Sequence, residues 1–190
     1  MYGKINYYFI IKVLTLMKKF IPTYYAQSIY EIDPSFFINE GVKTLLIDLD
    51  NTLASYDELL PSAQTVVYIG KLRAANLAVY IVSNNRDKRV REYAEALDVP
   101  YLASVRKPFA GKLRRYLKKE GVALRDVMMI GDQLLTDVFC ANNLGVKIIL
   151  TEQIVERDQW TTRFNRLLDR PIRKKLQKNG HLKEWNKHGR

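Results

Sequence analysis

Short, mainly apolar runs alternate along the chain with longer segments whose apolar residues recur at helical spacing. The apolar runs lie at residues 44–49, 77–82, 99–103, 127–130 and 146–150. Such runs are typical of strands buried on both faces of a parallel sheet. The segments with helical spacing lie at residues 62–76, 87–97, 109–120 and 135–144. Because strand and helix alternate throughout, the pattern predicts an α/β fold with a doubly wound parallel sheet, in which Gly145 caps the last helix.

Polar residues follow four of the predicted strands at the points where those strands end. They are Asp48, Asp50, Asn51 and Thr52 after the first strand, Ser83, Asn84 and Asn85 after the second, Arg106 and Lys107 after the third, and Gly131, Asp132 and Asp137 after the fourth. Ligands bind at the carboxyl ends of the strands in doubly wound folds. We therefore expect these residues to gather at one edge of the sheet.

Four carboxylates, one hydroxyl and one ammonium would meet at this edge. Carboxylates at close range cannot all stay ionised without a compensating charge, and an oxygen-only site favours Mg²⁺. One carboxylate could then attack a phosphoryl group while a neighbouring carboxylic acid protonates the leaving oxygen. Lys107 and the hydroxyl of Ser83 could hold the phosphoryl oxygens. The set predicts phosphoryl transfer through an aspartyl-phosphate.

Taken together, these motifs resemble those of the haloacid dehalogenase (HAD) superfamily. Residues 48–52, Asp-Leu-Asp-Asn-Thr, are similar to its first motif, D-x-D-x-T. Ser83 fits the second motif, Lys107 the third, and Gly131-Asp132 with Asp137 the fourth. The resemblance spans residues 44–150 and implies a HAD-like, Rossmann-type fold.

This resemblance implies a role for each matching carboxylate. Asp48 would be the nucleophile, and Asp50 the general acid and then the base that activates water. Mg²⁺ would be held by Asp48, Asp132, the backbone carbonyl of Asp50, and Asp137 directly or through water. Transport ATPases of the superfamily carry Thr at the second position and keep their phosphoenzyme, so the Asp found here favours a phosphatase.

Phosphate binding would fall to Ser83, Asn84 and Lys107, with Lys107 also stabilising charge during catalysis. Each of these residues has a structural alternative. Ser83 and Asn84 could form the turn after the strand, leaving backbone N–H groups to touch the phosphate. Lys107 could be a solvated lysine, and Asp50 could cap a turn.

The intervals between the motifs are short. Residues 54–80 and 86–106 each hold little more than one helix and one strand. Neither has room for the cap domain that usually sets substrate choice in this superfamily. The fold is therefore expected to be capless, and its open site would suit a phosphate displayed on a lipid membrane, a nucleic acid end or a protein.

Longer matches narrow the resemblance to the YqeG-type HAD IIIA phosphatases of Gram-positive bacteria. The similar region covers about residues 17–184 and includes residues 48–53, 131–138 and 162–166. A related group acts as the mitochondrial phosphatidylglycerophosphatase. The resemblance therefore implies removal of the terminal phosphate from phosphatidylglycerophosphate, which gives phosphatidylglycerol.

The 190-residue chain is 47% hydrophobic and 27% charged, so it can bury the core of a single domain. Its single cysteine, Cys140, excludes an intramolecular disulfide framework and a Cys-rich zinc site. The place of Cys140 in an apolar helix indicates core packing. These features suit a reducing compartment, and we expect a cytoplasmic protein.

Positive charge is concentrated at both ends of the chain. The net charge is +11, with +4 in residues 1–20 and +8 in residues 160–190, which leaves −1 for residues 21–159. We expect residues 160–190 to form a basic helical tail, with an amphipathic helix at 163–178 that is broken near Pro171. The tail could contact anionic lipid at the inner face of a membrane, bind RNA or the ribosome, or pack on the body.

Residues 7–17 are apolar but shorter than the ~20 residues that a membrane span needs, and residues 24–27, Tyr-Tyr-Ala-Gln, would make a poor signal-peptide cleavage site. We expect residues 1–16 to be an extension upstream of the natural start, and residues 17–190 to form the domain. A membrane-surface anchor and an element packed on the body are the alternatives.

Three functions stay open at this point. The first is a phosphatase acting on phosphatidylglycerophosphate. The second keeps the chemistry but acts on a soluble nucleotide, a sugar phosphate or a phosphoprotein. The third is an RNA- or ribosome-binding module that uses the basic tail. The intact catalytic set favours an enzyme, and the charge pattern favours a lipid substrate.

Overall fold

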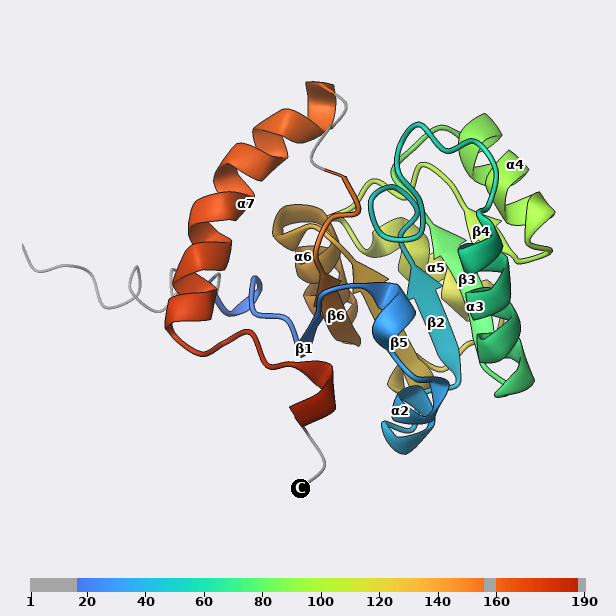
Figure 1. Cartoon of the computed structure of the whole chain (residues 1–190), viewed down its shortest axis with the longest axis horizontal. Coiled ribbons are helices and arrows are strands. Elements are labelled where there is room, and N and C mark those ends of the chain that lie inside the picture. Colours follow the sequence, from blue (N-terminus) through green and yellow to red (C-terminus); the bar gives the residue numbers. More distant parts are fainter. Residues whose placement is uncertain (1–16, 156–159, 188–190) are drawn as a thin grey trace, which may run out of the picture.

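Six parallel strands form one open sheet in this computed structural model, which describes residues 17–155 and 160–187 (Figure 1). Along the sheet the strands follow the order β1-β6-β5-β2-β3-β4. Their bounds are β1 Tyr24–Ala26, β2 Thr44–Ile47, β3 Ala78–Val82, β4 Tyr101–Leu102, β5 Val127–Gly131 and β6 Lys147–Thr151. Every neighbouring pair is parallel, so all carboxyl ends lie at one edge, which we call the carboxyl edge.

Helices α2 to α6 connect the strands, and α7 follows the last strand. They are α2 Pro34–Asn39, α3 Ala63–Ala74, α4 Asp87–Ala96, α5 Gly111–Lys119, α6 Phe139–Leu144 and α7 Trp160–Lys178. The last predicted helix begins differently from the expectation, because a π-helical turn, Leu134–Val138, precedes α6. Such wider turns occur frequently at functional sites. Gly145 caps α6 in the left-handed conformation, as expected.

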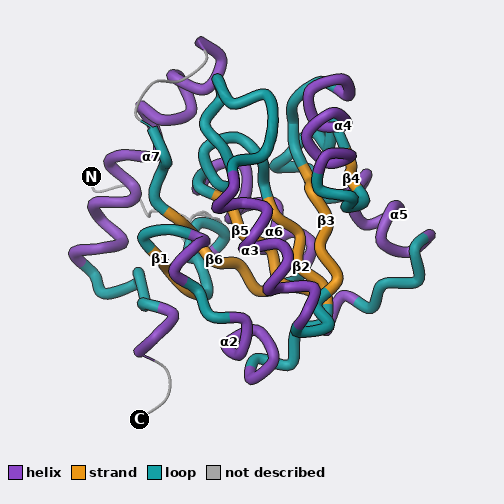
Figure 2. The backbone as a smooth tube through the Cα atoms, turned by 45° about the vertical axis from the view of Figure 1, so that its right-hand side comes forward, coloured by secondary structure: helices purple, strands orange, loops and turns teal. Residues whose placement is uncertain are grey.

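Both faces of the sheet are covered by helices (Figures 1 and 2). Successive side chains of a strand point to opposite faces, so Leu45 and Leu46 of β2 enter different cores. Leu45 packs in the core that contains residues of α2, α3 and α4, and Leu46 in the core that contains residues of α5 and α6. The predicted doubly wound α/β fold is confirmed.

The connections that would hold a cap domain are short. A loop and α3 join β2 to β3, and α4 with short turns joins β3 to β4. These residues are all described, and they contain no cap domain, as the sequence predicted.

The strand β1 and the helix α2 were not expected from the sequence. β1 is only three residues long and is an outermost strand of the sheet, where it pairs with β6. A strand this short shows no periodicity to detect. α2 is one and a half turns long, but it does carry a start signal, because the side chain of Asp33 accepts from the Ser35 N–H and Pro34 occupies the first turn.

The C-terminal part of the chain returns to the body. α7 passes through Pro171 as one helix, so the predicted break there is wrong. A proline removes one backbone hydrogen bond from a helix. Here the helix continues because Ile172 and Leu176, which follow the proline, pack against the core that contains residues of α5 and α6. Beyond α7, the Lys183 carbonyl accepts from the Tyr25 N–H at 2.7 Å.

Within residues 17–155 and 160–187, no helix combines the length and apolar character needed to cross a membrane. The prediction for residues 1–16 concerns residues outside the described ranges.

Candidate active site

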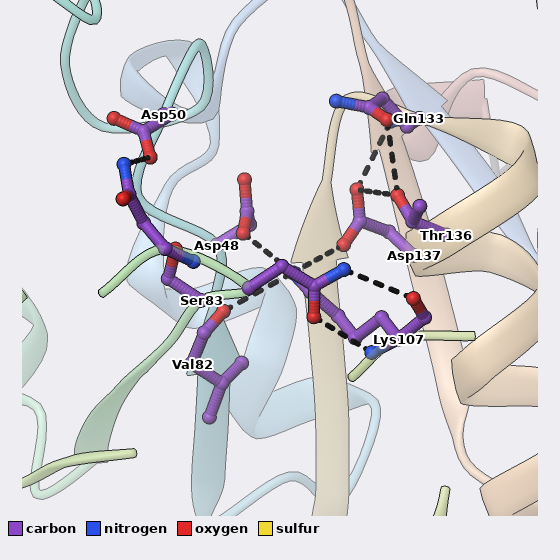
Figure 3. A network of polar contacts seen from close by, with 10 residues as sticks. Asp48, Asp50, Val82, Ser83, Lys107, Gln133, Thr136 and Asp137 are labelled. Atoms are coloured by element: carbon purple, nitrogen blue, oxygen red, sulfur yellow. Dashed lines mark hydrogen bonds and ion pairs between the residues drawn. The ribbon is translucent and has the colours of Figure 1, made fainter. Parts of the chain in front are cut away.

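Loops at the carboxyl edge carry the predicted site residues, and Figure 3 shows Asp48 and Asp137 on either side of Lys107. Asp48 follows β2 directly, and Ser83 follows β3. Lys107 lies in the loop after β4, Asp132 follows β5, and Asp137 lies in the π-helical turn. The fold thus gathers side chains that are far apart in the sequence.

Lys107 lies at the centre of this group and is only 6% exposed. Its ammonium donates to Asp48 Oδ1 at 2.5 Å, to Asp137 Oδ1 at 2.6 Å and to the Val82 carbonyl at 3.1 Å. All three protons of the ammonium therefore have acceptors. The alternative of a solvated lysine is wrong for Lys107.

Three buried carboxylates surround this ammonium. Asp48, Asp132 and Asp137 each offer an oxygen, and these oxygens lie within 4.8 Å of one another. One lysine cannot neutralise three ionised carboxylates, and charge buried without compensation is unfavourable. An all-oxygen, anionic donor set of this kind suits a hard divalent cation such as Mg²⁺.

The protonation behaviour of the group reflects its burial. Desolvation raises the pKa of Asp48 to about 7, although the Lys107 ammonium opposes the rise. Burial alone would lower the pKa of Lys107, but the adjacent carboxylates of Asp137 and Asp48 raise it overall. Lys107 therefore stays charged and favours the ionised form of Asp48.

Gly131, the last residue of β5, makes room for Asp137. A Cβ atom built at Gly131 would lie 2.6 Å from the Asp137 Cβ, closer than real side chains approach. Asp137 Oδ2 also accepts from the Gln133 N–H at 3.1 Å. Glycine is needed in the Gly131-Asp132 motif because the side chain of Asp137 packs directly over it.

Asp50 is held by a different set of contacts. Arg89 in α4 donates to Asp50 Oδ1 from Nε at 2.9 Å and from Nη2 at 2.6 Å. Asn85 donates to Asp50 Oδ2 at 3.2 Å. In Figure 3 the Asp50 carboxylate lies apart from the Lys107 cluster. Asp50 therefore does more than cap a turn, because its carboxylate pairs with side chains from other parts of the chain.

Ser83 and Asn84 form the turn after β3, as the alternative to direct phosphate binding predicted for both residues. The Ser83 hydroxyl is buried and accepts from the Asn85 N–H at 3.0 Å. The Asn84 side chain accepts from the Lys107 N–H at 2.7 Å and donates to the Lys107 carbonyl at 2.9 Å. Asn84 thus fixes the loop that carries Lys107.

α7 supports the same site from outside the four motifs. The buried Asp169 carboxylate accepts from the backbone N–H groups of Leu134 and Leu135, at 2.8 and 3.2 Å, at the start of the π-helical turn. Arg173 donates to the Asp132 carbonyl at 2.7 Å and to Glu152 at 2.8 Å. The C-terminal half of α7 therefore packs on the body.

Sequence reasoning did not find Arg89, Asp169 or Arg173. Arg89 lies on a highly charged helix, where basic side chains usually face solvent. Asp169 is one of only two acids in residues 160–190, and an acid that breaks a basic run is the signal that could have indicated a buried partner.

Comparisons with known proteins identify the family. A family model described as mitochondrial PGP phosphatase matches residues 6–155. The probable phosphatase YqeG of Bacillus subtilis (strain 168) is 34% identical over 170 residues, which cover 90% of this chain and 98% of that protein.

Solved structures add a likeness in fold. An uncharacterized protein from Listeria monocytogenes serotype 4b gives a TM-score of 0.50 at 14% identity, covering 62% of this chain and 85% of that one. A putative HAD family hydrolase from Streptomyces avermitilis MA-4680 gives a TM-score of 0.48 at 20% identity, covering 58% and 72%. At 14% identity the first likeness shows the fold alone.

The family match covers most of the chain and includes the residues that the sheet gathers around Lys107. The chain therefore belongs to the family that this model describes, within the HAD superfamily, and it is a YqeG-like HAD phosphatase.

Proposed function

We propose that the enzyme removes the terminal phosphate of phosphatidylglycerophosphate, with Mg²⁺, through an aspartyl-phosphate. The observation that carries the proposal is the buried group of Asp48, Lys107, Asp132 and Asp137 on an edge that no cap covers. The family description supports this substrate. An open edge supports it as well, because a lipid headgroup can reach the site without entering an enclosed cavity.

In the first step a carboxylate oxygen of Asp48 attacks phosphorus. The bond from phosphorus to the glycerol oxygen breaks, and Asp50 gives its proton to that oxygen. In the second step Asp50 takes a proton from water, and the water oxygen attacks phosphorus. The Asp48–phosphorus linkage then breaks, which releases inorganic phosphate and restores Asp48.

Lys107 would act in both steps of this reaction. Its contacts with Asp48 and Asp137 keep it charged and hold its ammonium beside the nucleophile, where a bound phosphoryl oxygen can replace one of its three present acceptors as negative charge develops. Ser83 and the backbone N–H of Asn84 would complete phosphate binding from the turn after β3.

Mg²⁺ would be held by the side chains of Asp48 and Asp132, the backbone carbonyl of Asp50, and Asp137 directly or through water. When bound, the ion neutralises carboxylate and phosphate charge, so that one anion can approach another. We place the enzyme in the cytoplasm, as a peripheral protein on the inner face of a membrane, where its substrate would lie.

Phosphate release tests the proposal. The enzyme is given phosphatidylglycerophosphate in mixed micelles with Mg²⁺, beside a panel of soluble nucleotide and sugar phosphates and a phosphoprotein. We expect rapid release from the lipid. Asp48→Asn should lower the rate by roughly a thousandfold or more, because the nucleophile is lost.

The outcomes separate the two parts of the proposal. Release from soluble esters but not from the lipid would keep the phosphatase and reject the substrate. Equal release by Asp48→Asn would reject the aspartyl-phosphate.

A further inference from the structure

Exposed apolar side chains concentrate around the carboxyl edge. Among the described residues, nine large hydrophobic residues are exposed. Five of them lie on loops that follow β2, β4 or β6: Tyr56, Leu59, Leu60, Phe109 and Ile154. Because strands β2, β4 and β6 end at the carboxyl edge, these side chains lie on loops at the same edge as the candidate active site.

Phe109 is the most exposed of the group, at 75%. It lies two residues after Lys107, and its N–H donates to the Arg106 carbonyl at 3.0 Å. The same loop is fixed to the site by the paired hydrogen bonds between Asn84 and Lys107. A partner surface that contacts Phe109 would therefore lie next to the reacting groups.

A basic pocket adjoins this ring. It has a volume of about 480 Å³ and is lined by Phe109 together with Arg106, Lys112 and Arg115, with no acidic side chain among its lining residues. The ammonium of Lys112 donates to the Ala103 and Ser104 carbonyls at 2.6 and 3.0 Å, which fixes one of the three cations in place.

The exposed leucines in the loop after β2 lie beside acidic residues instead of basic ones. Leu59 and Leu60 directly follow Asp57 and Glu58, so their loop does not complement an anionic surface. The Phe109 pocket, by contrast, combines an exposed aromatic ring with three basic side chains and has no acidic side chain in its lining.

We propose that the surface formed by Phe109, Arg106, Lys112 and Arg115, which we call the Phe109 surface, docks the enzyme on an anionic phospholipid bilayer. The inference rests on the proposed function and names the surface that brings the site to its lipid. Phe109 enters the interfacial region of the bilayer, and Arg106 and Arg115 pair with lipid phosphates. An aromatic ring among cations fits the boundary between acyl chains and anionic headgroups.

Vesicle binding by the full chain tests this surface. Sedimentation compares vesicles of phosphatidylglycerol and phosphatidylcholine with vesicles of phosphatidylcholine alone. The chain should bind the anionic vesicles, and Phe109→Ser and Arg115→Glu should each weaken that binding at least about fivefold. Both side chains are exposed, and thermal melts followed by circular dichroism check that the variants fold.

Two matched variants at the opposite edge serve as controls. Ile38 is 53% exposed on α2, which leads into β2, and the Arg125 side chain is 87% exposed just before β5. Figure 1 shows α2 at the bottom of the molecule, away from the carboxyl edge. Ile38→Ser and Arg125→Glu should bind vesicles as the unaltered chain does.

The results distinguish this proposal from the function on which it rests. Vesicle binding that both variants lose, without hydrolysis of phosphatidylglycerophosphate, would retain the Phe109 surface and reject the substrate. Hydrolysis of the lipid with unchanged binding by the variants would overturn the surface alone. Tighter binding to single-stranded RNA than to vesicles, lost in the same variants, would also overturn it.

Discussion

Arg89 fixes the position of a carboxylate that the proposed mechanism uses twice. It sends two hydrogen bonds to one oxygen of Asp50, and it donates to the Glu58 and Ser55 carbonyls at 2.9 and 3.1 Å. Its guanidinium also lies 5.3 Å from the centre of the Tyr56 ring. Arg89 is therefore a positioning residue that ties Asp50 to the loop after β2.

Arg89→Ala should lower kcat by roughly tenfold to a hundredfold and change KM much less. The reason is that a catalytic group displaced by about 1 Å can lose two orders of magnitude in rate. Arg89→Lys should restore only part of kcat, because one ammonium cannot reproduce the planar, forked contact. Steady-state kinetics on the substrate that the wild type hydrolyses fastest measures both values.

Arg91→Ala is the matched control for Arg89. Arg91 lies on the same helix, is about half exposed and pairs with Asp87 at 3.5 Å, so its loss should leave kcat unchanged. An unchanged kcat in Arg89→Ala would contradict the positioning role.

Single residues differed in how well they could be predicted. Asp48, Asp132, Asp137 and Lys107 stand at or after strand ends, where a parallel sheet brings distant residues to one edge. Arg89 could not be found in this way, because it lies within α4 and not at a strand end. Its contact with Asp50, in the loop after β2, depends on how that loop packs against the helix. Only the folded geometry distinguishes Arg89 from its solvated neighbours.

At the scale of elements, α7 serves as a support for the π-helical turn. Asp169 accepts from the two N–H groups that begin this turn, and Arg173 holds the backbone of Asp132. Desolvation raises the pKa of Asp169 to about 6, although its backbone hydrogen bonds and Arg173 oppose the rise. The carboxylate that supports the turn is therefore sensitive to pH.

The native state keeps a proton on Asp169 at pH values where the unfolded chain has lost it. The contribution of this group to stability is therefore largest below pH 4 and falls as the pH rises through about 6. Asp169→Asn cannot titrate. Between pH 4 and pH 7 its free energy of unfolding should rise relative to wild type by up to about 3 kcal/mol.

Urea unfolding at the two pH values measures this difference. Glu92→Gln provides the comparison, because the Glu92 side chain is 49% exposed and makes only a long 3.9 Å ion pair with Lys88. It should show little relative change. A parallel pH dependence in wild type and Asp169→Asn would show that Asp169 titrates as an ordinary exposed carboxyl.

The elements that sequence reasoning predicted are those marked by a continuous apolar run or by apolar residues at helical spacing. Strands β2, β3, β5 and β6 are buried on both faces, so each appears as an apolar run. β1 has three residues and gains its place by pairing with β6, which no local pattern announces. The π-helical turn was likewise hidden, because Leu134–Val138 has the same apolar spacing as the start of an ordinary helix.

At the scale of the whole molecule, Cys140 offers a probe of global unfolding. It is the only cysteine, it is fully buried in the core that contains residues of α5 and α6, and burial raises the pKa of its thiol to about 11. Thiol reagents attack the exposed thiolate. Labelling in native buffer should therefore be at least about a thousandfold slower than in denaturant, if opening costs the usual 5 kcal/mol or more.

Labelling followed by mass spectrometry measures both rates. Adding urea below the unfolding midpoint should accelerate the native reaction in proportion to the unfolded population. Fast labelling in native buffer would contradict the packing described for α6.

The pairing of β1 has a consequence for biosynthesis. β1 leaves the ribosome early, yet its partner β6 is made more than a hundred residues later, and the backbone that contacts Tyr25 on its other side later still. The sheet therefore cannot close progressively behind the ribosome. A nascent chain that pauses before Lys183 presents an open strand edge on which other chains can assemble. Synthesis must therefore pass Lys183, and not only the catalytic motifs, before the backbone of β1 has its contacts on both sides.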